Sequence, residues 1–410
     1  MTPGLVGSID WVAWWLLVAR VVIVFAALLV AVMLVIWMER KVVADMQTRI
    51  GPNRAGPFGL MITLADGAKL FFKEGITPAT ADLAVYLVAP LVSVIPALLA
   101  FSVIPFGPGV VIDGHYVPFQ VSDLSIGILW VLAMASLAVY GVVLAGWSSG
   151  SNYPLLGSIR SSAQMISYEV GMSLGLIAVV LYCGTLTMSG IVAVQGRHFG
   201  VPGLTWLPKW NLFLQFPAFL IYAVAALAET NRPPFDLPEA ESELVAGYHT
   251  EYSGIKFAMF YLAEYTHMVT ISAVAVTLFL GGWHGPVFSF ASWLWPVVWF
   301  VAKLVAVAFL LIWIRATLPR FRYDRLMSFG WKVLIPVGLL WILVTAAAVM
   351  LPLATDWEPW RIALVIASGT IAIVLLLYPL FVGPRGEPAG LPEPGAPEPR
   401  GHLSRTGGAP

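Results

Sequence analysis

The sequence has 410 residues, of which 59% are hydrophobic and only 11% are charged. Ordinary soluble proteins carry about 25% charged residues, so this composition excludes a water-soluble globular fold. The 22 basic residues balance 22 acidic ones, so no net field exists to attract nucleic acid or to steer a charged partner. Any electrostatic function must therefore be local.

Apolar segments long enough to cross a membrane recur along the chain. A helix needs about 20 residues to cross about 30 Å of hydrocarbon. The sequence predicts an all-α polytopic membrane protein with about nine transmembrane helices in a single domain, residues 1–382. Their approximate limits are 14–37, 83–106, 124–146, 163–183, 211–229, 256–282, 293–316, 332–352 and 360–382. Residues 383–410, rich in Pro, Gly and Glu, are expected to form a disordered cytoplasmic tail.

Lysine and arginine residues fall mostly on one side of this arrangement. The loops on the other side contain Arg197, Lys209 and Arg361. Because positive charge gathers in cytoplasmic loops, we expect the N-terminus outside the cell and the C-terminus in the cytoplasm. The first residues lack the pattern of a cleavable signal or transit peptide, so insertion through the first helix is expected.

The first cytoplasmic loop, residues 39–82, is unusually long, and loops of this length usually have a function. A turn signal at Gly51-Pro52-Asn53 is followed by a segment of helical periodicity. Its polar residues recur every three or four positions, at Thr63, Asp66, Lys69 and Lys73. The pattern predicts an amphipathic helix at the membrane surface, either a simple anchor or the lining of a ligand entrance.

A second cytoplasmic loop, residues 230–255, is acidic although it lies on the side that favours positive charge. This loop and the residue before it carry Glu229, Asp236, Glu239, Glu241, Glu243 and Glu251. Glu239 and Glu243 lie four residues apart, where mutual repulsion on one helix face favours the retention of a proton. The loop is therefore either a site of proton exchange or an ordinary solvated acidic segment.

Ionisable residues also lie within the predicted spans, where burial in hydrocarbon is costly and indicates function. Glu169 and Glu264 fall in the cytoplasmic halves of the fourth and sixth spans, and Lys303 falls near the middle of the seventh. His267 lies three residues beyond Glu264, on nearly the same helix face. Together with the acidic loop, the three carboxylates Glu169, Glu229 and Glu264 and the lysine Lys303 favour a hydrated proton path over simple pairing between helices.

Cys183 is the only cysteine of the chain. A single cysteine excludes an intrachain disulfide and an iron–sulfur cluster held by four cysteines of this chain. Of the 6 histidines, only His267 lies well inside an apolar segment, which argues against a transmembrane bis-histidine haem. We therefore expect neither an iron–sulfur cluster of this kind nor such a haem in this chain.

Several strings resemble one family, the quinone-site membrane subunit of NADH-quinone oxidoreductase (respiratory complex I), known as its H subunit. They are RIGPNRAGPFGLMITLADGAKLFFKE, AETNRPPFDLPEAESELVAGYHTEYSG, FYLAEY, SYE at residues 167–169, and RATLPRFRYDRLMSFGWK. These strings occur in the order of the family's patterns, and the resemblance runs from about residue 15 to 350. The ninth span and the tail lie beyond it.

The resemblance implies a subunit of a proton-translocating NADH:quinone oxidoreductase, inactive alone, in the inner (plasma) membrane of a bacterium. It implies a quinone as substrate, either ubiquinone or menaquinone, with iron–sulfur clusters and FMN in partner subunits. The implied partners are peripheral-arm quinone-site and iron–sulfur subunits, small membrane subunits and antiporter-like subunits, besides the lipid bilayer. No nucleic acid is expected.

The resemblance also implies roles for particular residues, none of which would reduce the quinone headgroup directly or bind a metal. The positions that match the family's quinone chamber are Arg40, Lys41, Gln47, Arg49, Arg54, Asp66, Lys69, Lys73, Arg232 and Phe235. Those expected in the proton path are Glu169, Glu229, Asp236, Glu239, Glu241, Glu243, Glu251 and Glu264, with Lys303 added from its position in the membrane.

Two other interpretations remain open from the sequence. A homologous subunit of a membrane-bound hydrogenase-type complex would keep the fold and change the chemistry. A proton-coupled secondary transporter would also use intramembrane carboxylates, but the two halves of the chain show no repeated pattern.

Overall fold

The computed structural model describes residues 11–112, 115–197, 208–236, 244–287, 290–355, 361, 365, 368, 369 and 371. Glu239, Glu241 and Glu243, most of the predicted ninth span and the whole predicted tail lie outside these residues. The described helices are α1 (Trp11–Met46), η1 (Pro57–Gly59), α2 (Ile62–Phe72), α3 (Leu83–Phe101), α4 (Gly127–Ser148), α5 (Asn152–Cys183), α6 (Met188–Gln195), α7 (Asn211–Leu214), α8 (Phe216–Glu229), η2 (Gly247–His249), α10 (Ile255–Phe279), α11 (Trp295–Thr317), α12 (Tyr323–Phe329), the π-helical turn η3 (Gly330–Leu334) and α13 (Ile335–Thr355).

The prediction of a helical, polytopic membrane protein is confirmed. Seven helical segments of the described chain are long and apolar enough to cross a membrane: α1, α3, α4, α5, α10, α11 and the run from α12 to α13. The predicted fifth span is broken at Gln215 into α7 and α8, and the 14 residues of α8 extend only about 21 Å. The count of nine spans is thus not confirmed.

Two local features, the length of α1 and a short hairpin, were not expected from the sequence, whereas a third, the amphipathic helix, was. Helix α1 continues to Met46, nine residues past the predicted end at 37, so the first part of the predicted loop is helical. The amphipathic helix is present as α2. A short antiparallel hairpin between α3 and α4, β1 (Val110–Ile112) with β2 (His115–Val117), was not predicted. Its register places Val110 opposite Val117.

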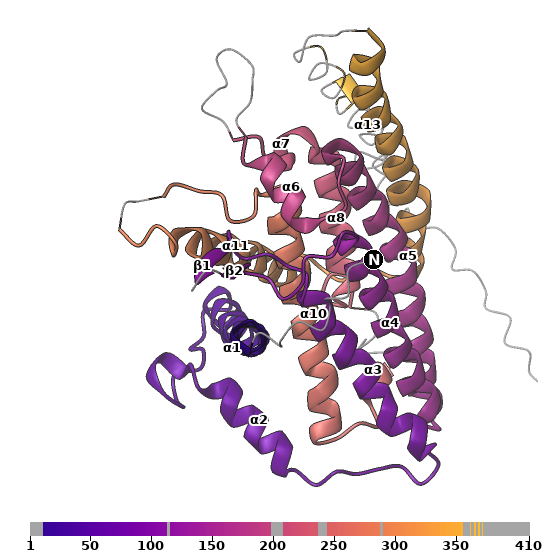
Figure 1. Cartoon of the computed structure of the whole chain (residues 1–410). Coiled ribbons are helices and arrows are strands. Elements are labelled where there is room, and N and C mark those ends of the chain that lie inside the picture. Colours follow the sequence, from indigo (N-terminus) through magenta and orange to yellow (C-terminus); the bar gives the residue numbers. More distant parts are fainter. Residues whose placement is uncertain are drawn as a thin grey trace, which may run out of the picture.

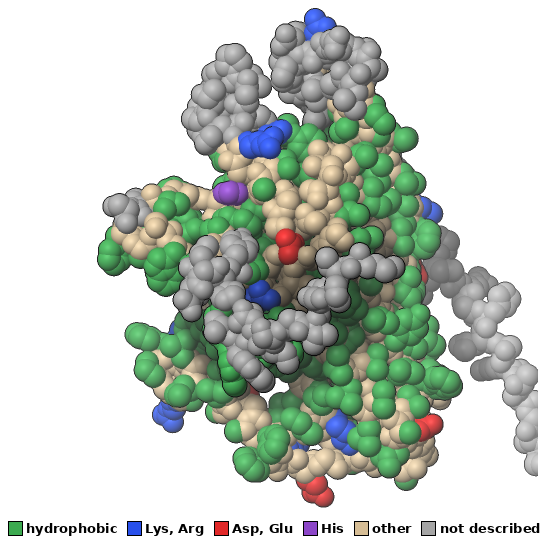
Figure 2. Space-filling model, in the orientation of Figure 1, with side chains coloured by type: hydrophobic (Ala, Val, Ile, Leu, Met, Phe, Trp, Pro, Cys, Tyr) green, Lys and Arg blue, Asp and Glu red, His purple; other side chains and the backbone are tan. Residues whose placement is uncertain are grey.

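The polarity of the helices is the reverse of that in a soluble protein. In α5, Ser158, Ser161 and Gln164 are buried, whereas Ile159 and Ile166 are exposed. An amphipathic helix of a soluble protein turns its apolar stripe inward, so this orientation fits a bundle surrounded by lipid. Apolar side chains accordingly cover most of the visible face of the helices (Figure 2).

Helix α10 is the centre of the bundle. It is buried along 83% of its most apolar stretch, whereas no other candidate span exceeds 44% among the described residues. It packs against α3, α11 and α1. In Figure 1, α1 is seen almost end-on and α11 lies across the view, while α4, α5 and α13 stand upright. The spans therefore cross at steep angles around α10.

Small residues allow close approaches beside the centre of the bundle. A Cβ atom added to Gly141 of α4 would lie 2.7 Å from the backbone nitrogen of Ser93 on α3. A Cβ atom added to Gly157 of α5 would lie 2.8 Å from the Cα atom of Gly247 in η2. Real Cβ atoms do not approach this closely, so these glycines hold α3 against α4 and the end of the acidic loop against α5.

Candidate functional site

A buried ionic cluster joins four elements at the end of the bundle where α10 begins. The guanidinium Nε of Arg232, in the acidic loop, lies 2.7 Å from Oε1 of Glu264 on α10. The Nη1 atom of Arg232 lies 3.4 Å from Oε1 of Glu39 on α1, and Arg315 of α11 also forms an ion pair with Glu39. The side chains of Arg232 and Glu264 are each 10% exposed and that of Glu39 is 7% exposed, so these charges are stabilised by one another in place of water.

Aromatic rings cover one side of this cluster. The Arg232 guanidinium carbon lies 4.4 Å from the ring centroid of Tyr265 and 6.0 Å from that of Tyr261. The hydroxyl oxygens of the two tyrosines are 3.1 Å apart. Stacking on aromatic faces is a property of arginine that lysine reproduces poorly, so this position is built for a guanidinium group.

A turn after α8 places Arg232. Asn231 has a φ of 52°, in the left-handed region that asparagine tolerates better than most residues. The Gln164 amide of α5 donates to the carbonyl of Ala228 before the turn, at 2.7 Å, and to that of Phe235 after it, at 2.8 Å. One buried side chain therefore fixes both sides of the turn.

A second polar pair lies deeper in the bundle. The Nε2 atom of His267 on α10 lies 3.0 Å from Oε1 of Glu229, the last residue of α8. Glu229 is only 5% exposed, and its Oε2 atom has no hydrogen-bond partner among the described residues. Glu169 of α5 accepts a hydrogen bond from Ser136 of α4. The three predicted intramembrane carboxylates thus lie on three helices that face one interior.

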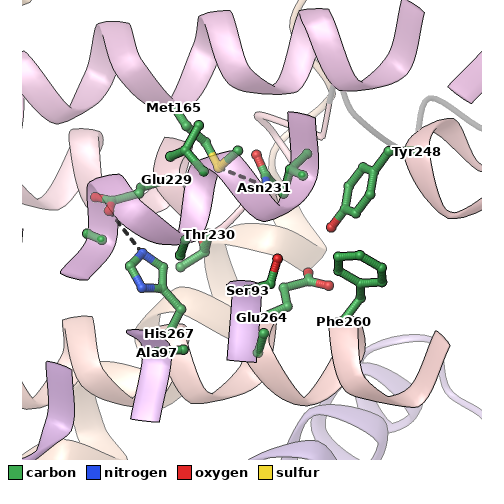
Figure 3. Close-up of a pocket in the computed structure, with 15 residues that line it drawn as sticks. Ser93, Ala97, Met165, Glu229, Thr230, Asn231, Tyr248, Phe260, Glu264 and His267 are labelled. Carbon is green, nitrogen blue, oxygen red and sulfur yellow. Dashed lines mark hydrogen bonds and ion pairs between the residues drawn. The ribbon is translucent and has the colours of Figure 1, made fainter. Parts of the chain in front are cut away.

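A cavity of about 60 Å³ connects the cluster and the deeper pair (Figure 3). A water molecule needs about 10–15 Å³ of such space, so several waters fit. Within the described residues, Ser93 Oγ, Asn231 Oδ1 and Glu229 Oε2 have no partner, and all three residues line this cavity. Buried polar atoms of this kind normally bind ordered water. The lining residues are Ser93, Ala97, Ala135, Ala138, Val139, Val142, Met165, Glu229, Thr230, Asn231, Tyr248, Phe260, Ala263, Glu264 and His267.

The end of the acidic loop packs over this cavity through η2. His249 is buried against the rings of Phe257 and Phe260. Burial, with a contribution from the positive charge of Arg232, lowers the pKa of His249 to about 3. The imidazole is therefore neutral in the folded protein at neutral pH.

The residues expected to line a quinone chamber divide into two groups. Those of α1, α2 and their connection lie at the surface of this chain: the Arg40 guanidinium is 2.6 Å from an Asp66 carboxylate oxygen, Lys69 is 3.5 Å from the same carboxylate, and Lys41 donates to Asn53 Oδ1 at 2.7 Å. The remaining members of this group, all exposed, are Gln47, Arg49, Arg54 and Lys73.

The other expected chamber residues are interior. Arg232 lies in the ionic cluster, and Phe235 packs with its ring centroid 5.8 Å from those of Tyr168 and Phe321. None of the described side chains of α2 is buried, and Phe71 and Phe72 are 67% and 85% exposed. The structure therefore presents an open, apolar and basic surface on α1 and α2, separate from the buried cluster.

Four expected path residues of the described chain do not line the cavity: Glu169, Asp236, Glu251 and Lys303. The Lys303 ammonium donates to the carbonyl oxygens of Leu280, Gly282 and His284 at 2.8, 3.0 and 2.7 Å, beyond the far end of α10. Asp236 and Glu251 are partly buried in the acidic loop, and neither lines the cavity. Within the described part of the chain, no group of His, Cys, Asp and Glu is placed to hold a metal ion.

Sequence reasoning did not include Glu39, Arg315, His267 or Ser136 among the site residues. Glu39 was assigned to a loop because the first span was expected to end at 37, and the continuation of α1 places it inside the bundle. The available signal was the charged MERK string directly after an apolar run, where a carboxylate so close to the bilayer requires a partner. Ser136 gave no signal, since a serine in a span is common.

The fold and the site define a class: a polytopic membrane protein with buried ionic groups beside a small cavity near one end of its bundle. A family model described as NADH dehydrogenase matches residues 19–346, and the chain belongs to this family.

Its relatives include the H subunits of the NADH-quinone oxidoreductases of Frankia casuarinae and Frankia alni. Each is 54% identical over 370 residues, which cover 89% of this chain and 80% of the relative. The chain is thus a membrane subunit of the NADH-quinone oxidoreductase type, which confirms the resemblance seen in the sequence. These findings favour that interpretation over a hydrogenase-type subunit or a transporter.

Replacement of Arg232 by Gln should strongly destabilise the bundle, because Glu39 and Glu264 would lose the cation between them. Removal of one partner of a buried ion pair costs about 3–5 kcal/mol. We expect a lower thermal transition of the purified complex and less complex in membranes. Arg322→Gln is the matched control, since its side chain is 83% exposed and its pair with Asp324 contributes little. Equal thermal stability of the two variants would contradict the role given to Arg232.

Acidification should loosen the packing of η2. His249 has a folded pKa of about 3, below its ordinary value near 6.5, so the unfolded state binds more protons between these values. The stability contributed by the neutral imidazole is present above about pH 6.5 and falls by up to about 1.4 kcal/mol per pH unit below it. Hydrogen exchange of the amides of residues 247–249 between pH 7.5 and 5 measures this. His249→Gln should flatten the dependence, and an unchanged slope would show that another group titrates.

Proposed function

We propose that this chain forms the membrane wall of a quinone chamber and the carboxylate-lined proton path that couples quinone reduction to proton translocation. The observation that carries the proposal is the cavity lined by Glu229, Glu264 and His267, which lies between a buried ionic cluster and the Glu229–His267 pair. Family membership supports the substrate, because the relatives are named as subunits of an NADH-quinone oxidoreductase.

The proposed proton path begins in the acidic loop and continues into the bundle. Glu239, Glu241 and Glu243 would collect protons at the cytoplasmic face, where their mutual repulsion favours protonation. Glu264 and Glu229 line one cavity large enough for a chain of waters, and Glu169 lies beyond it on α5. Carboxylates joined by water can pass protons over such a distance without moving the backbone.

The proposed chamber is the surface between the end of α1 and α2. The apolar side chains of α2 suit an isoprenoid tail, and the basic residues Arg40 and Lys41 suit a headgroup that becomes negative as it accepts electrons. Because this surface is open in the chain alone, the partner subunits would complete the chamber. They would also supply the electrons, from iron–sulfur clusters and FMN.

The coupling between chamber and path would run through two adjacent residues of α1. Arg40 faces Asp66 on α2, whereas Glu39 faces Arg232 and Arg315 in the buried cluster. Negative charge on a reduced quinone would compete with Asp66 for Arg40, and the change in local field would reach Arg232 and Glu264 beside the cavity. In a buried region such fields are poorly screened.

The proposal includes an orientation and a location. With the basic loops in the cytoplasm, the N-terminus lies outside, and the acidic loop and α2 lie at the inner face of a bacterial plasma membrane. The peripheral-arm subunits would bind there. The small and antiporter-like membrane subunits would bind along the bundle.

Replacement of Glu229 by Gln in the assembled complex should lower proton translocation and quinone reduction together by at least about tenfold, because the path loses a proton carrier. Glu241→Gln and Glu243→Gln should act in the same direction. Proton uptake and NADH oxidation in membrane vesicles measure both rates. Glu74→Gln serves as the control, since Glu74 is exposed outside the path. Unchanged rates in all three path variants would overturn the proposal.

Replacement of Arg40 by Gln should raise the KM for quinone, since the headgroup loses a charged partner at the chamber. A lost charge-assisted interaction of about 1.4 kcal/mol corresponds to about tenfold in kcat/KM. Steady-state kinetics with a short-chain quinone measure this, with NADH oxidation by ferricyanide as a check on the peripheral subunits. Arg325→Gln is the matched control, an exposed arginine away from α1 and α2. An equal KM in both variants would exclude Arg40 from the chamber.

A further inference from the structure

His267 lies outside the strings that resemble the family, so the resemblance implies no role for it. Helix α10 turns one face toward the interior, and along this face Glu264 is followed by His267 and then by Thr270, Ile271 and Val274. The cavity described above ends at His267. A second, smaller cavity of about 10 Å³ begins at the same residue and continues along α10, away from the cytoplasmic end.

The two cavities meet at a single polar pair. Three residues line both of them: Ala135, Glu229 and His267. The smaller cavity is otherwise lined mostly by apolar side chains, with the polar groups of Tyr222 and Thr270. Any route that uses both cavities therefore passes the Glu229–His267 pair.

The pair is suited to proton transfer by its geometry. Nε2 of His267 lies 3.0 Å from Oε1 of Glu229, a normal hydrogen-bond distance. The other carboxylate oxygen, Oε2, is buried without a partner among the described residues, in a position to meet water in either cavity. Histidine is the side chain whose ordinary pKa, about 6.5, allows both uptake and release of a proton near neutral pH.

We propose that His267 relays protons between the two cavities. It would itself accept and release protons, as the carboxylates of the path do. This inference rests on the proposed function. A protonated Glu229 would transfer its proton to Nε2 of a neutral imidazole, which leaves a carboxylate and an imidazolium as an ion pair. The imidazolium would then release one proton from its other ring nitrogen to water, and one proton has crossed the junction.

The charged and titratable groups around His267 are few. Glu229 and Tyr222 face it from α8, and Glu169 on α5 interacts electrostatically with both Glu229 and His267. Glu264 lies one turn earlier on α10 itself. The cavity linings of α3 and α4 are apolar, except for Ser93. No described residue in these linings is a lysine or an arginine, and Glu264 is already paired with Arg232, so Glu229 and Glu169 are the carboxylates whose charge acts on His267.

The alternative role of His267 is a purely structural one, in which its N–H only holds Glu229 in place. His267→Gln separates the two roles, because the glutamine amide retains a hydrogen-bond donor and cannot carry a proton at these pH values. His267→Asn, with a shorter side chain, serves if the first variant does not assemble. His284→Gln is the matched control, a histidine outside both cavities whose Nε2 lies 3.1 Å from the Val192 carbonyl oxygen.

The test is proton translocation and NADH:quinone reduction by the assembled complex in proteoliposomes, from pH 5.5 to 8.5. Subunit content and ferricyanide reduction verify assembly. For His267→Gln we expect translocation at least about tenfold slower and a changed pH profile, because the imidazole that accepts and releases the proton is gone. His284→Gln should follow the unaltered complex. If His267→Gln, or His267→Asn in its place, kept both the rate and the pH profile, the relay would be excluded.

Glu229→Gln in the same assay separates this inference from the proposed function. If translocation stops in Glu229→Gln and persists in the His267 variants, the path exists and His267 only positions Glu229. If translocation persists in Glu229→Gln as well, the proposed path itself is wrong. Slow translocation in both variants supports both conclusions.

Discussion

The structure depends on the burial of opposite charges in a bundle whose outer surface is apolar. Arg232 lies between Glu39 and Glu264, and Arg315 pairs with the same oxygen of Glu39 as Arg232 does. Each of these charges alone would be costly inside a membrane protein, and their mutual attraction in a region of low dielectric offsets that cost only while all partners are in place. This requirement fixes α1, the acidic loop, α10 and α11 relative to one another.

The same cluster defines the surroundings of the cavity. Because Arg232 is held by its partners, the turn that contains Asn231 and the end of α8 are held as well, and Gln164 secures that turn from α5. Glu229 is thereby presented to His267 across the interior. The proposed coupling between a redox site and a proton path requires such an arrangement, a rigid polar network next to a space large enough for water.

Helix α1 connects the interior with the surface. Its last turns place Glu39 inside the bundle and Arg40 toward α2, so two consecutive residues contact two different sites. In a helix, consecutive side chains point about 100° apart, so one rigid element can take part in both sites without bending. Lys303 has a different place: it caps the backbone beyond the far end of α10 through three carbonyl groups.

The sequence by itself determined the class of fold, the amphipathic helix that ends at Phe72 and the presence of carboxylates within the spans, since hydrophobic length and helical periodicity are local properties. Only the tertiary structure decided that α1 continues to Met46, that α8 is too short to span alone, and that Arg232 pairs with both Glu39 and Glu264. The reason is physical: the partners of a buried charge come from segments up to 276 residues apart in the chain, as Arg315 and Glu39 are. No local pattern encodes which of them meet, because the choice depends on how the helices pack.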